Sequence, residues 1–478
     1  MQKRFFLGLL LLMTSLMTSC GGQAMLPPMT DSAMASPTPA STSTPPATAT
    51  LTPVPDPTLT ATLAPLVIPT FTPVLTLSNE AEVNPGSLIA GDLAFLSLQG
   101  EEVWLYTVAV DGSSLTKVSE VTSWDQPQWS PDGKALAFRG KEVEGMSPLY
   151  VIRESDPAPV RVTTGLDVSS YAWSPEGDRL AFSAVVEGQK DIYLLSLDTL
   201  ALTNVTSSQD IVEWGPVWSP TGTQIAFYSS SVHTACMEGV CSYEIYIMDI
   251  TDTADHYQIR VDPDSLYEGG GCDLTWSPDG RYLAFIQGCE TVGNWVPCLF
   301  DSQTGSTSRL VTDQNLFFAV WEVDWISEDE LSLLHLYTQD DRLYAINRSG
   351  ENLSLLFPGA NLDSLAGSWT GDHRLYTWHD RISHEIFIGD MTTNQSLPTG
   401  IKGCDPVWAP SGDWLAFTTI CFDESSQQGV LAMRRNGSRV ILSVGSVGDI
   451  EVMHRDGSGL LNLTLDVPGG SFQPFWKP

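Results

Sequence analysis

The segment Trp276-Ser-Pro-Asp-Gly-Arg-Tyr-Leu-Ala-Phe285 recurs along the chain with small changes and decides its fold. Each clear copy contains a tryptophan, a turn-forming tetrapeptide and an apolar run that ends in phenylalanine. Clear copies begin at Trp129, Trp173, Trp218, Trp276 and Trp408, weaker copies begin at Trp325 and Trp369, and Trp476 lies near the end of the chain. Such self-similarity indicates one supersecondary unit that must stack on its neighbours to bury its apolar faces.

The tetrapeptide of each copy predicts a tight turn between two strands. Proline presets the backbone angle φ and glycine accepts positive φ, so the segment closes a hairpin. Further strand-like runs follow in each unit, such as Ile192–Leu195 and Val160–Thr163. Four short strands in each repeat are typical of a β-propeller blade. We therefore predict an all-β chain built from four-stranded antiparallel blades.

The two ends of the repeat region supply the parts of one further blade. Residues 93–118 hold three strand-like runs without an innermost partner, whereas Phe472–Trp476 is an innermost strand without its three followers. If the C-terminal strand joins the N-terminal blade, the ring closes with eight blades. Seven blades is the alternative, if the unit at Trp325 or Trp369 is degenerate.

The blades resemble the WSPDG-type repeats of the TolB-like β-propeller family. The resemblance rests on the segments that begin at Trp129 and Trp276 and extends over residues 85–478. It implies the propeller fold, but the motif is shared by proteins of unrelated function. The chain differs from TolB in its higher repeat count and in the segment before the propeller, where that family has an α/β domain.

The N-terminal residues predict export and anchoring. Lys3 and Arg4 precede an apolar run, and small residues then lead to Cys20. Because Met17–Cys20 resembles a bacterial lipobox, we expect residues 1–19 to be a lipoprotein signal peptide and Cys20 to carry the lipid; a cleaved signal with an ordinary thiol is the alternative. Residues 20–84 are rich in threonine and proline and predict a disordered tether. The propeller is thus expected outside the cytoplasm, at the cell surface or in the periplasm.

The charge balance limits the class of partner. The formal net charge is −34 at pH 7. A chain with this much negative charge is not expected to bind nucleic acid or anionic lipid, because both are negatively charged. We therefore expect contact with a membrane only through the lipid anchor. Cationic partners or metal ions are favoured, although solubility alone also accounts for the charge.

Three insertions lengthen the chain, around residues 229–243, 286–297 and 418–449. Each is expected between the second and third strands of a blade, on the face that also carries the connections between blades. We call this the insertion face, and the face with the Ser-Pro turns the turn face. Loops on one side of a rigid scaffold commonly bind partners. Trp295 lies in one insertion and either stacks on a sugar or peptide or packs locally.

The position three residues before each innermost tryptophan is expected to line the mouth of the central channel. It is polar in most blades, and together with a neighbouring aspartate it forms a predicted ring of Gln126, Asp273, Glu322, Asp324, Asp405 and Gln473. Converging carboxylates can bind a divalent cation or a partner segment that carries lysine or arginine. The alternative is that a water-filled channel simply needs a polar lining.

The cysteines predict disulfides, which export permits. In each of two blades, one cysteine lies four residues before the repeat tryptophan and another lies thirteen residues after it. The expected hairpin register places each such pair across neighbouring strands. The predicted bridges are Cys272–Cys289, Cys404–Cys421 and, within one insertion, Cys236–Cys241, which leaves Cys298 over.

His379 and His384 flank a turn on the insertion face, beside Asp380 and Glu385. Two imidazoles and a carboxylate could bind a transition metal, and a solvated polar turn is the alternative. The sequence has no Gly-x-Ser-x-Gly elbow and no His-Glu-x-x-His motif.

These patterns favour a membrane-tethered extracytoplasmic module that binds a protein, peptide or glycan, without chemistry of its own and without a cofactor unless a divalent cation binds. The alternative is a metal-dependent, lyase-type propeller enzyme that degrades polysaccharide, because propeller lyases with related repeats use a histidine-rich metal site.

Overall fold

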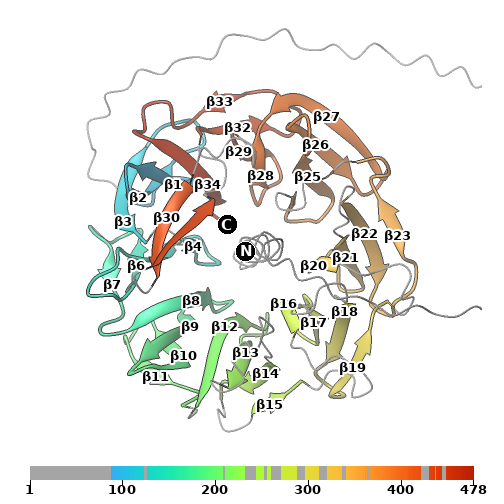
Figure 1. Ribbon diagram of the computed structural model, residues 1–478. Helices are drawn as coiled ribbons and strands as arrows, with labels where there is room; N and C mark the ends of the chain where they lie inside the picture. Colours follow the sequence, from blue (N-terminus) through green and yellow to red (C-terminus); the bar gives the residue numbers. More distant parts are fainter. Residues whose placement is uncertain are drawn as a thin grey trace, which may run out of the picture. The chain divides into compact units, whose positions relative to one another are not determined.

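The computed structural model describes residues 88–122, 126–207, 210–231, 244–251, 256–259, 271–287, 296–311, 320–335, 341–360, 362, 367–420, 430–435, 438–443 and 448–478. Over these residues the chain forms eight four-stranded antiparallel sheets arranged in a ring around a central axis (Figure 1). This confirms the predicted eight-bladed β-propeller, including full blades at Trp325 and Trp369. In this described part, no helix has the length and apolar character needed to cross a membrane.

The first four blades follow one another along the chain. Blade 1 contains β4 (Gln128–Trp129), β5 (Ala135–Arg139), β6 (Leu149–Arg153) and β7 (Val160–Arg161). Blade 2 contains β8 (Asp167–Trp173), β9 (Arg179–Val186), β10 (Gln189–Ser196) and β11 (Leu202–Asn204). Blade 3 contains β12 (Ile211–Trp218), β13 (Gln224–Ser231), β14 (Glu244–Asp249) and β15 (His256–Gln258). Blade 4 contains β16 (Gly271–Trp276), β17 (Tyr282–Gln287), β18 (Val296–Asp301) and β19 (Ser306–Arg309).

The remaining blades complete the ring. Blade 5 contains β20 (Val320–Trp325), β21 (Glu330–His335), β22 (Arg342–Asn347) and β23 (Ser354–Leu356). Blade 6 contains β24 (Ser368–Trp369), β25 (Leu375–His379), β26 (Glu385–Asp390) and β27 (Gln395–Lys402). Blade 7 contains β28 (Cys404–Trp408), β29 (Trp414–Thr418), β32 (Ile450–His454) and β33 (Leu461–Asn462), with the separate hairpin β30 (Val430–Arg435) and β31 (Ser438–Ser443) inserted. Blade 8 contains β34 (Gly470–Trp476), β1 (Leu93–Gln99), β2 (Glu102–Val108) and β3 (Thr116–Val121).

Blade 8 closes the ring with strands from both ends of the described chain. β34 pairs antiparallel with β1, and Leu93 lies opposite Trp476. The predicted closure by the C-terminal strand is therefore confirmed. Closure removes the open edges that an unclosed row of sheets would present.

The turn between the first two strands of blade 1 shows why the repeat needs its serine and aspartate. The backbone N–H of Gly133, at φ 70°, donates to the carbonyl oxygen of Ser130 at 2.8 Å. The Ser130 hydroxyl donates to Oδ1 of Asp132 at 2.7 Å and accepts from the N–H of Ala135 at 2.9 Å. The hydrogen bond from Ser130 is the largest of the effects that lower the pKa of Asp132 to about 2.

The core lies between adjacent blades, where the repeated phenylalanines are almost completely buried, at 2% exposure or less: Phe138, Phe182, Phe227, Phe285 and Phe417. One core cluster joins Leu149 of blade 1 to Trp173 of blade 2, and another joins Trp129 of blade 1 to Phe475 of blade 8. Each blade thus depends on its neighbours for burial, as the repeat predicted.

In six of the eight blades, the tryptophan that ends the innermost strand links neighbouring blades. Its indole N–H donates to the carbonyl oxygen just before the tryptophan of the preceding blade, for example from Trp173 to Gln128 at 2.9 Å and from Trp476 to Val407 at 2.9 Å. The same bond is present at Trp129, Trp218, Trp276 and Trp325. We call this series of bonds the tryptophan ladder.

Candidate functional site

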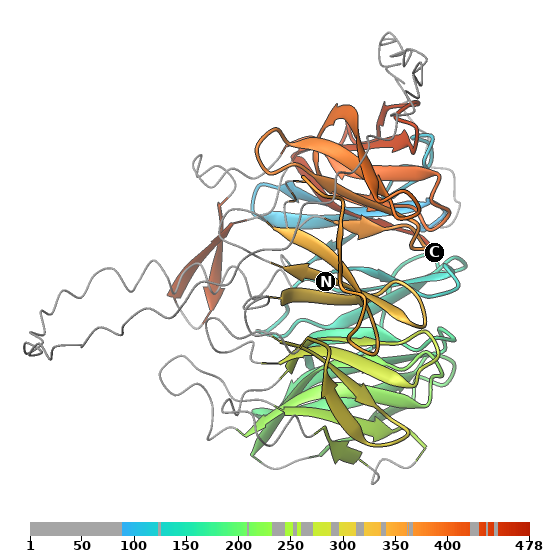
Figure 2. The same cartoon turned by 90° about the vertical axis from the view of Figure 1, so that its right-hand side faces the viewer.

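The insertions all connect the second and third strands of their blades. They join β13 to β14, β17 to β18, and β29 to β32, so they open on one face of the ring as expected. The β30–β31 hairpin belongs to the last of these connections and lies to one side of the ring in the edge-on view of Figure 2. The Ser-Pro turns join first and second strands and therefore lie on the opposite, turn face.

Four of the eight exposed large apolar side chains among the described residues lie on the insertion face. Four such residues lie in its connections: Val143 at 46% exposure, Ile382 at 82%, Ile420 at 57% and Leu465 at 57%. On the turn face, the corresponding connections contribute Leu200 at 53%, and the other three exposed residues, Val160, Leu202 and Leu397, lie on outermost strands. Because an exposed large apolar side chain is unfavourable in water, such a bias marks a surface suited to a partner.

Two buried or half-buried acid–base groups lie at the insertion-face ends of blades 5 and 7. Burial, and then the nearby Arg342, lower the pKa of His335. Burial, and then the neighbouring Asp449 carboxylate, raise the pKa of Glu451. The Asp449 carboxylate also accepts from the Asn462 amide at 3.0 Å.

The predicted channel-mouth position is a β-bulge in several blades. The register of the innermost strand shifts between Cys272 and Thr275 and between Cys404 and Val407. These two bulges contain residues of positive φ, Asp273 at 59° and Asp405 at 53°. In two other blades, Gln473 at 52° and Gly215 at 65° take the same conformation. Aspartate and glycine tolerate this conformation better than most residues, so the bulge gives a local reason for their presence.

Two members of the predicted ring connect neighbouring blades. Oδ2 of Asp273 accepts from the N–H of Val323 at 2.7 Å. Oδ1 of Asp324 accepts from the Thr275 hydroxyl of the preceding blade at 3.5 Å, and also from the N–H of Trp325 in its own strand at 2.9 Å. Half-buried Glu322, Asp405 and Gln473 lie on β20, β28 and β34, and half-buried Gln126 comes just before β4. These contacts show a structural use for Asp273 and Asp324; cation binding by the ring stays a prediction.

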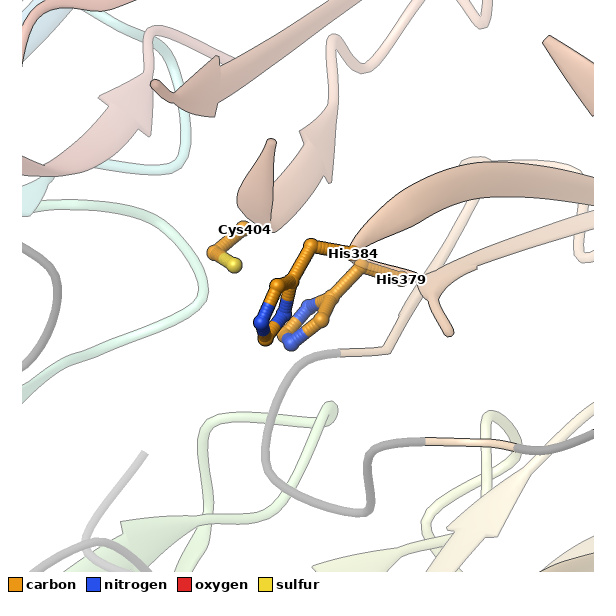
Figure 3. Close-up of side chains that lie close together, drawn as sticks. All are labelled: His379, His384 and Cys404. Atoms are coloured by element: carbon orange, nitrogen blue, oxygen red, sulfur yellow. The ribbon is translucent and has the colours of Figure 1, made fainter. Parts of the chain in front are cut away.

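His379, His384 and Cys404 come together at the boundary between blades 6 and 7 (Figure 3). One potential ligand atom from each lies within 4.8 Å of the others. His379 is 5% exposed and Cys404 is 1% exposed. His384 is half-buried, and its Nδ1 is buried without a hydrogen-bond partner among the described residues. We call these three residues the histidine–cysteine cluster.

The turn between β25 and β26 fixes the two histidines. Oδ1 of Asp380 accepts from the N–H of Ile382 at 3.0 Å and from the N–H of Ser383 at 2.7 Å. His384 has a positive φ of 56°, and its N–H donates to the carbonyl oxygen of Asp380 at 2.9 Å. The Asp380 carboxylate therefore caps this turn.

The other carboxylate beside the histidines also has a structural contact. Oε1 of Glu385 accepts from the N–H of Gly400 at 3.0 Å. Neither Asp380 nor Glu385 belongs to the cluster of potential ligands, in which the third donor is Cys404. The sequence did not suggest this donor because it comes from the next blade.

Backbone contacts hold Cys404 beside His384. The N–H of Gly403 donates to the carbonyl oxygen of His384 at 2.9 Å. The Thr418 hydroxyl donates to the carbonyl oxygen of Cys404 at 3.1 Å. A Cβ atom on Gly403 would lie 2.3 Å from the Phe417 ring, so only glycine fits at this approach of the two blades.

Cys404 is disulfide-bonded. The residue opposite it on β29 is Thr418, so the expectation that the register places Cys421 directly across is wrong by three positions. Likewise Ile286, not Cys289, lies opposite Cys272. The strand pairing reaches only Thr418 and Gln287 in these two hairpins, and the predicted bridges themselves stay predictions. Cys298 is a buried thiol whose Sγ donates to Oε1 of Gln287 at 3.6 Å.

The tryptophan ladder is interrupted at Trp408, which lies at the opposite end of β28 from Cys404. Trp408 is 4% exposed, and its Nε1 has no hydrogen-bond partner among the described residues. The preceding blade contributes an innermost strand of two residues, Ser368 and Trp369. Among the described residues, no ladder bond joins blades 6 and 7.

Several predicted site residues lie outside the described residues: Trp295, Cys20, Cys236, Cys241, Cys289 and Cys421.

No protein-family model matches the chain. A TolB homolog from Chlorobium luteolum is 32% identical over 146 residues, which cover 30% of this chain and 33% of that protein. The Tol-Pal system protein TolB from Francisella tularensis subsp. mediasiatica is 24% identical over 146 residues, covering 30% of this chain and 34% of that protein. The chain thus spans about a third of the length of these curated relatives.

The crystal structure of dipeptidyl peptidase 4 from Porphyromonas gingivalis is similar with a TM-score of 0.55 and 10% sequence identity, covering 79% of this chain and 58% of that chain. This likeness concerns the fold alone.

Proposed function

We propose that this TolB-like β-propeller is an extracytoplasmic module that binds a protein partner through its insertion face. The observation that carries the proposal is the gathering of exposed apolar residues at the connections of this face, led by Ile382 and Ile420. The similarity to proteins named for the Tol-Pal system supports a protein partner in the cell envelope.

The insertion face offers both affinity and selectivity. Burial of a fully exposed isoleucine contributes on the order of 1.5–3 kcal/mol before the costs of association. The net charge of −34 attracts a cationic partner and speeds its encounter with the propeller. A partner segment with apolar residues flanked by lysine or arginine fits these two properties. A finer form of the proposal specifies the ligand: a peptide, or a glycan that stacks on Trp295.

The tether is part of the proposal. A lipid on Cys20 and an extended segment up to residue 84 would hold the propeller near the outer side of a bacterial membrane. Growth with a labelled fatty acid tests this directly: label is expected on wild-type protein and not on a Cys20→Ala variant. Equal labelling of the two proteins would contradict it.

The polysaccharide-lyase alternative depends on the histidine–cysteine cluster. One member of that cluster is a disulfide-bonded sulfur, and the neighbouring Asp380 and Glu385 carboxylates already accept backbone hydrogen bonds. These contacts favour the binding function over the lyase function.

Site-specific photo-crosslinking in cells tests the binding face. A photoreactive amino acid is placed at residue 382 or 420 on the insertion face, or at the similarly exposed residue 200 on the turn face. We expect one discrete crosslinked protein from positions 382 and 420, and none from position 200. Crosslinking from position 200 alone would refute the assignment of the face.

A further inference from the structure

We propose that the histidine–cysteine cluster is a redox-gated site for a thiophilic d¹⁰ cation such as Zn²⁺, closed while Cys404 is in its disulfide and open when that disulfide is reduced. The site goes beyond the proposed binding function and does not depend on it. It rests on the geometry of three side chains from two blades.

The donor set suits such a cation. The potential ligand atoms of His379, His384 and Cys404 lie within 4.8 Å of one another. Zinc–nitrogen bonds of about 2.0–2.1 Å and a zinc–sulfur bond of about 2.3 Å would bring these donors to roughly 3.3–3.6 Å apart in a tetrahedral site. Small rotations of the two imidazoles, whose ring centroids are 6.0 Å apart, would supply the difference. Two imidazoles and one thiolate leave a fourth position for water or another donor.

The buried position of the cluster favours a ligand there. Nδ1 of His384 is buried and lacks a hydrogen-bond partner among the described residues. A buried polar atom without a hydrogen-bond partner destabilises the fold until it gains one. Metal coordination is one way to provide that partner, and the surrounding burial would keep bulk water from competing for it.

The oxidation state of Cys404 decides whether the donor set is complete. A disulfide sulfur is neutral and is not the thiolate that binds zinc. With Cys404 bonded to another cysteine, the cluster offers two imidazoles and binds metal weakly. After reduction, the Cys404 thiol loses its proton as the metal binds, and the resulting thiolate completes the set.

The gating step is a thiol–disulfide exchange with a dithiol reductant. One thiolate of the reductant attacks the disulfide, and its second thiol resolves the mixed disulfide. The Cys404 disulfide bond breaks, a disulfide forms in the oxidised reductant, and two electrons and two protons are transferred to the two cysteine sulfurs.

The location of the cluster permits the small movement that coordination requires. It lies between blades 6 and 7 at the insertion-face end of β28, where His384 is only half-buried. The bond from Gly403 N–H to the His384 carbonyl oxygen still holds the two backbone segments together. The main chain is therefore fixed while the side chains can adjust.

Metal retention by the full chain tests the proposal. Oxidised protein, and protein reduced anaerobically with a phosphine that is then removed, are each incubated with Zn²⁺, passed over a chelating resin and analysed for zinc. We expect about one additional zinc per chain after reduction, and an affinity at least about tenfold lower in a His379→Gln, His384→Gln variant. Cys298→Ser is the matched control, because it removes a different buried thiol and should leave retention unchanged.

A second readout does not depend on the histidine variants folding well. Zinc should slow alkylation of the Cys404 thiol in reduced wild-type protein, as measured by mass spectrometry of the Cys404 peptide. Absence of additional zinc after reduction, equal affinity in the histidine variant, or alkylation of Cys404 that zinc leaves unchanged would each overturn the proposal.

Discussion

Nε1 of Trp129 donates a hydrogen bond to the carbonyl oxygen of Phe475 at 3.2 Å, across 346 positions of sequence. This bond joins the first complete blade to the strand that closes the ring. It belongs to the same ladder that links the other blades, so the closing contact uses the chemistry of the repeat itself.

The ladder bond at Trp129 should contribute measurably to stability. Trp129→Phe removes the indole N–H and leaves the Phe475 carbonyl oxygen without this donor. Trp408→Phe is the matched control, because Trp408 is comparably buried and its Nε1 has no hydrogen-bond partner among the described residues. We expect Trp129→Phe to lower the free energy of unfolding by about 1 kcal/mol more than Trp408→Phe does, in denaturant titrations. Equal losses would show that the bond at Trp129 contributes nothing.

The close approach of blades 6 and 7 can be tested at Gly403. Gly403→Ala places a Cβ atom 2.3 Å from the Phe417 ring and should destabilise the protein by about 1–3 kcal/mol. Phe417→Leu frees space, so the double variant should be more stable than the sum of the two single effects predicts. Thermal or chemical unfolding of the four proteins measures this coupling; strict additivity would contradict the clash.

The aspartate of the first Ser-Pro turn should make stability depend on pH in acid. The pKa of Asp132 is lowered from 3.8 to about 2, so its carboxylate form is favoured by the folded state. The corresponding stabilisation is present above about pH 4 and is lost as the pH falls towards 2. It is modest, because the side chain is 46% exposed.

Asp132→Asn therefore tests this pH dependence. Wild type should be more stable than the variant at neutral pH, and the two unfolding free energies should converge in acid. If the difference in unfolding free energy between wild type and variant stayed constant from pH 7 to pH 2, the Asp132 carboxylate would not be the source of the pH dependence.

Peptide mapping under non-reducing conditions should reveal the cysteine pairing. We expect fragments linked through Cys404–Cys421, Cys272–Cys289 and Cys236–Cys241, and alkylation of Cys298 only after unfolding, because Cys298 is buried. A fragment that joins Cys404 to a cysteine other than Cys421 would refute the predicted pairing, as would rapid alkylation of Cys298 in the native protein.

The repeat predicts the fold well because each copy carries its own turn and packing residues. Trp129 and Trp476 are separated by most of the chain, yet their shared motif predicts that both end innermost strands of a closed ring. The sequence repeat does not, however, predict the β-bulges in the innermost strands. Trp408 pairs with Leu415, which by itself would place residue 419 opposite Cys404, and the bulge between Cys404 and Val407 shifts this partner by one more residue, to Thr418. Offsets counted along the sequence therefore misplaced Cys421 by three positions.

The sequence predicted the two histidines of the candidate site but not its third donor. The spacing of His379 and His384 around a turn suggests a metal site, but the turn itself uses Asp380 as its cap. The third donor, Cys404, lies in the next blade and approaches through the contact between Gly403 and His384. A contact between blades depends on packing that a local motif does not encode.

Hydrogen–deuterium exchange of the full chain, with and without the partner captured by crosslinking, tests the central claim most directly. Bound partner should slow exchange in the insertion-face connections at residues 380–385 and 448–449, and leave the turn-face segments at residues 130–134 and 277–281 unchanged. Protection confined to the turn-face segments would contradict the claim that this propeller binds through its insertion face.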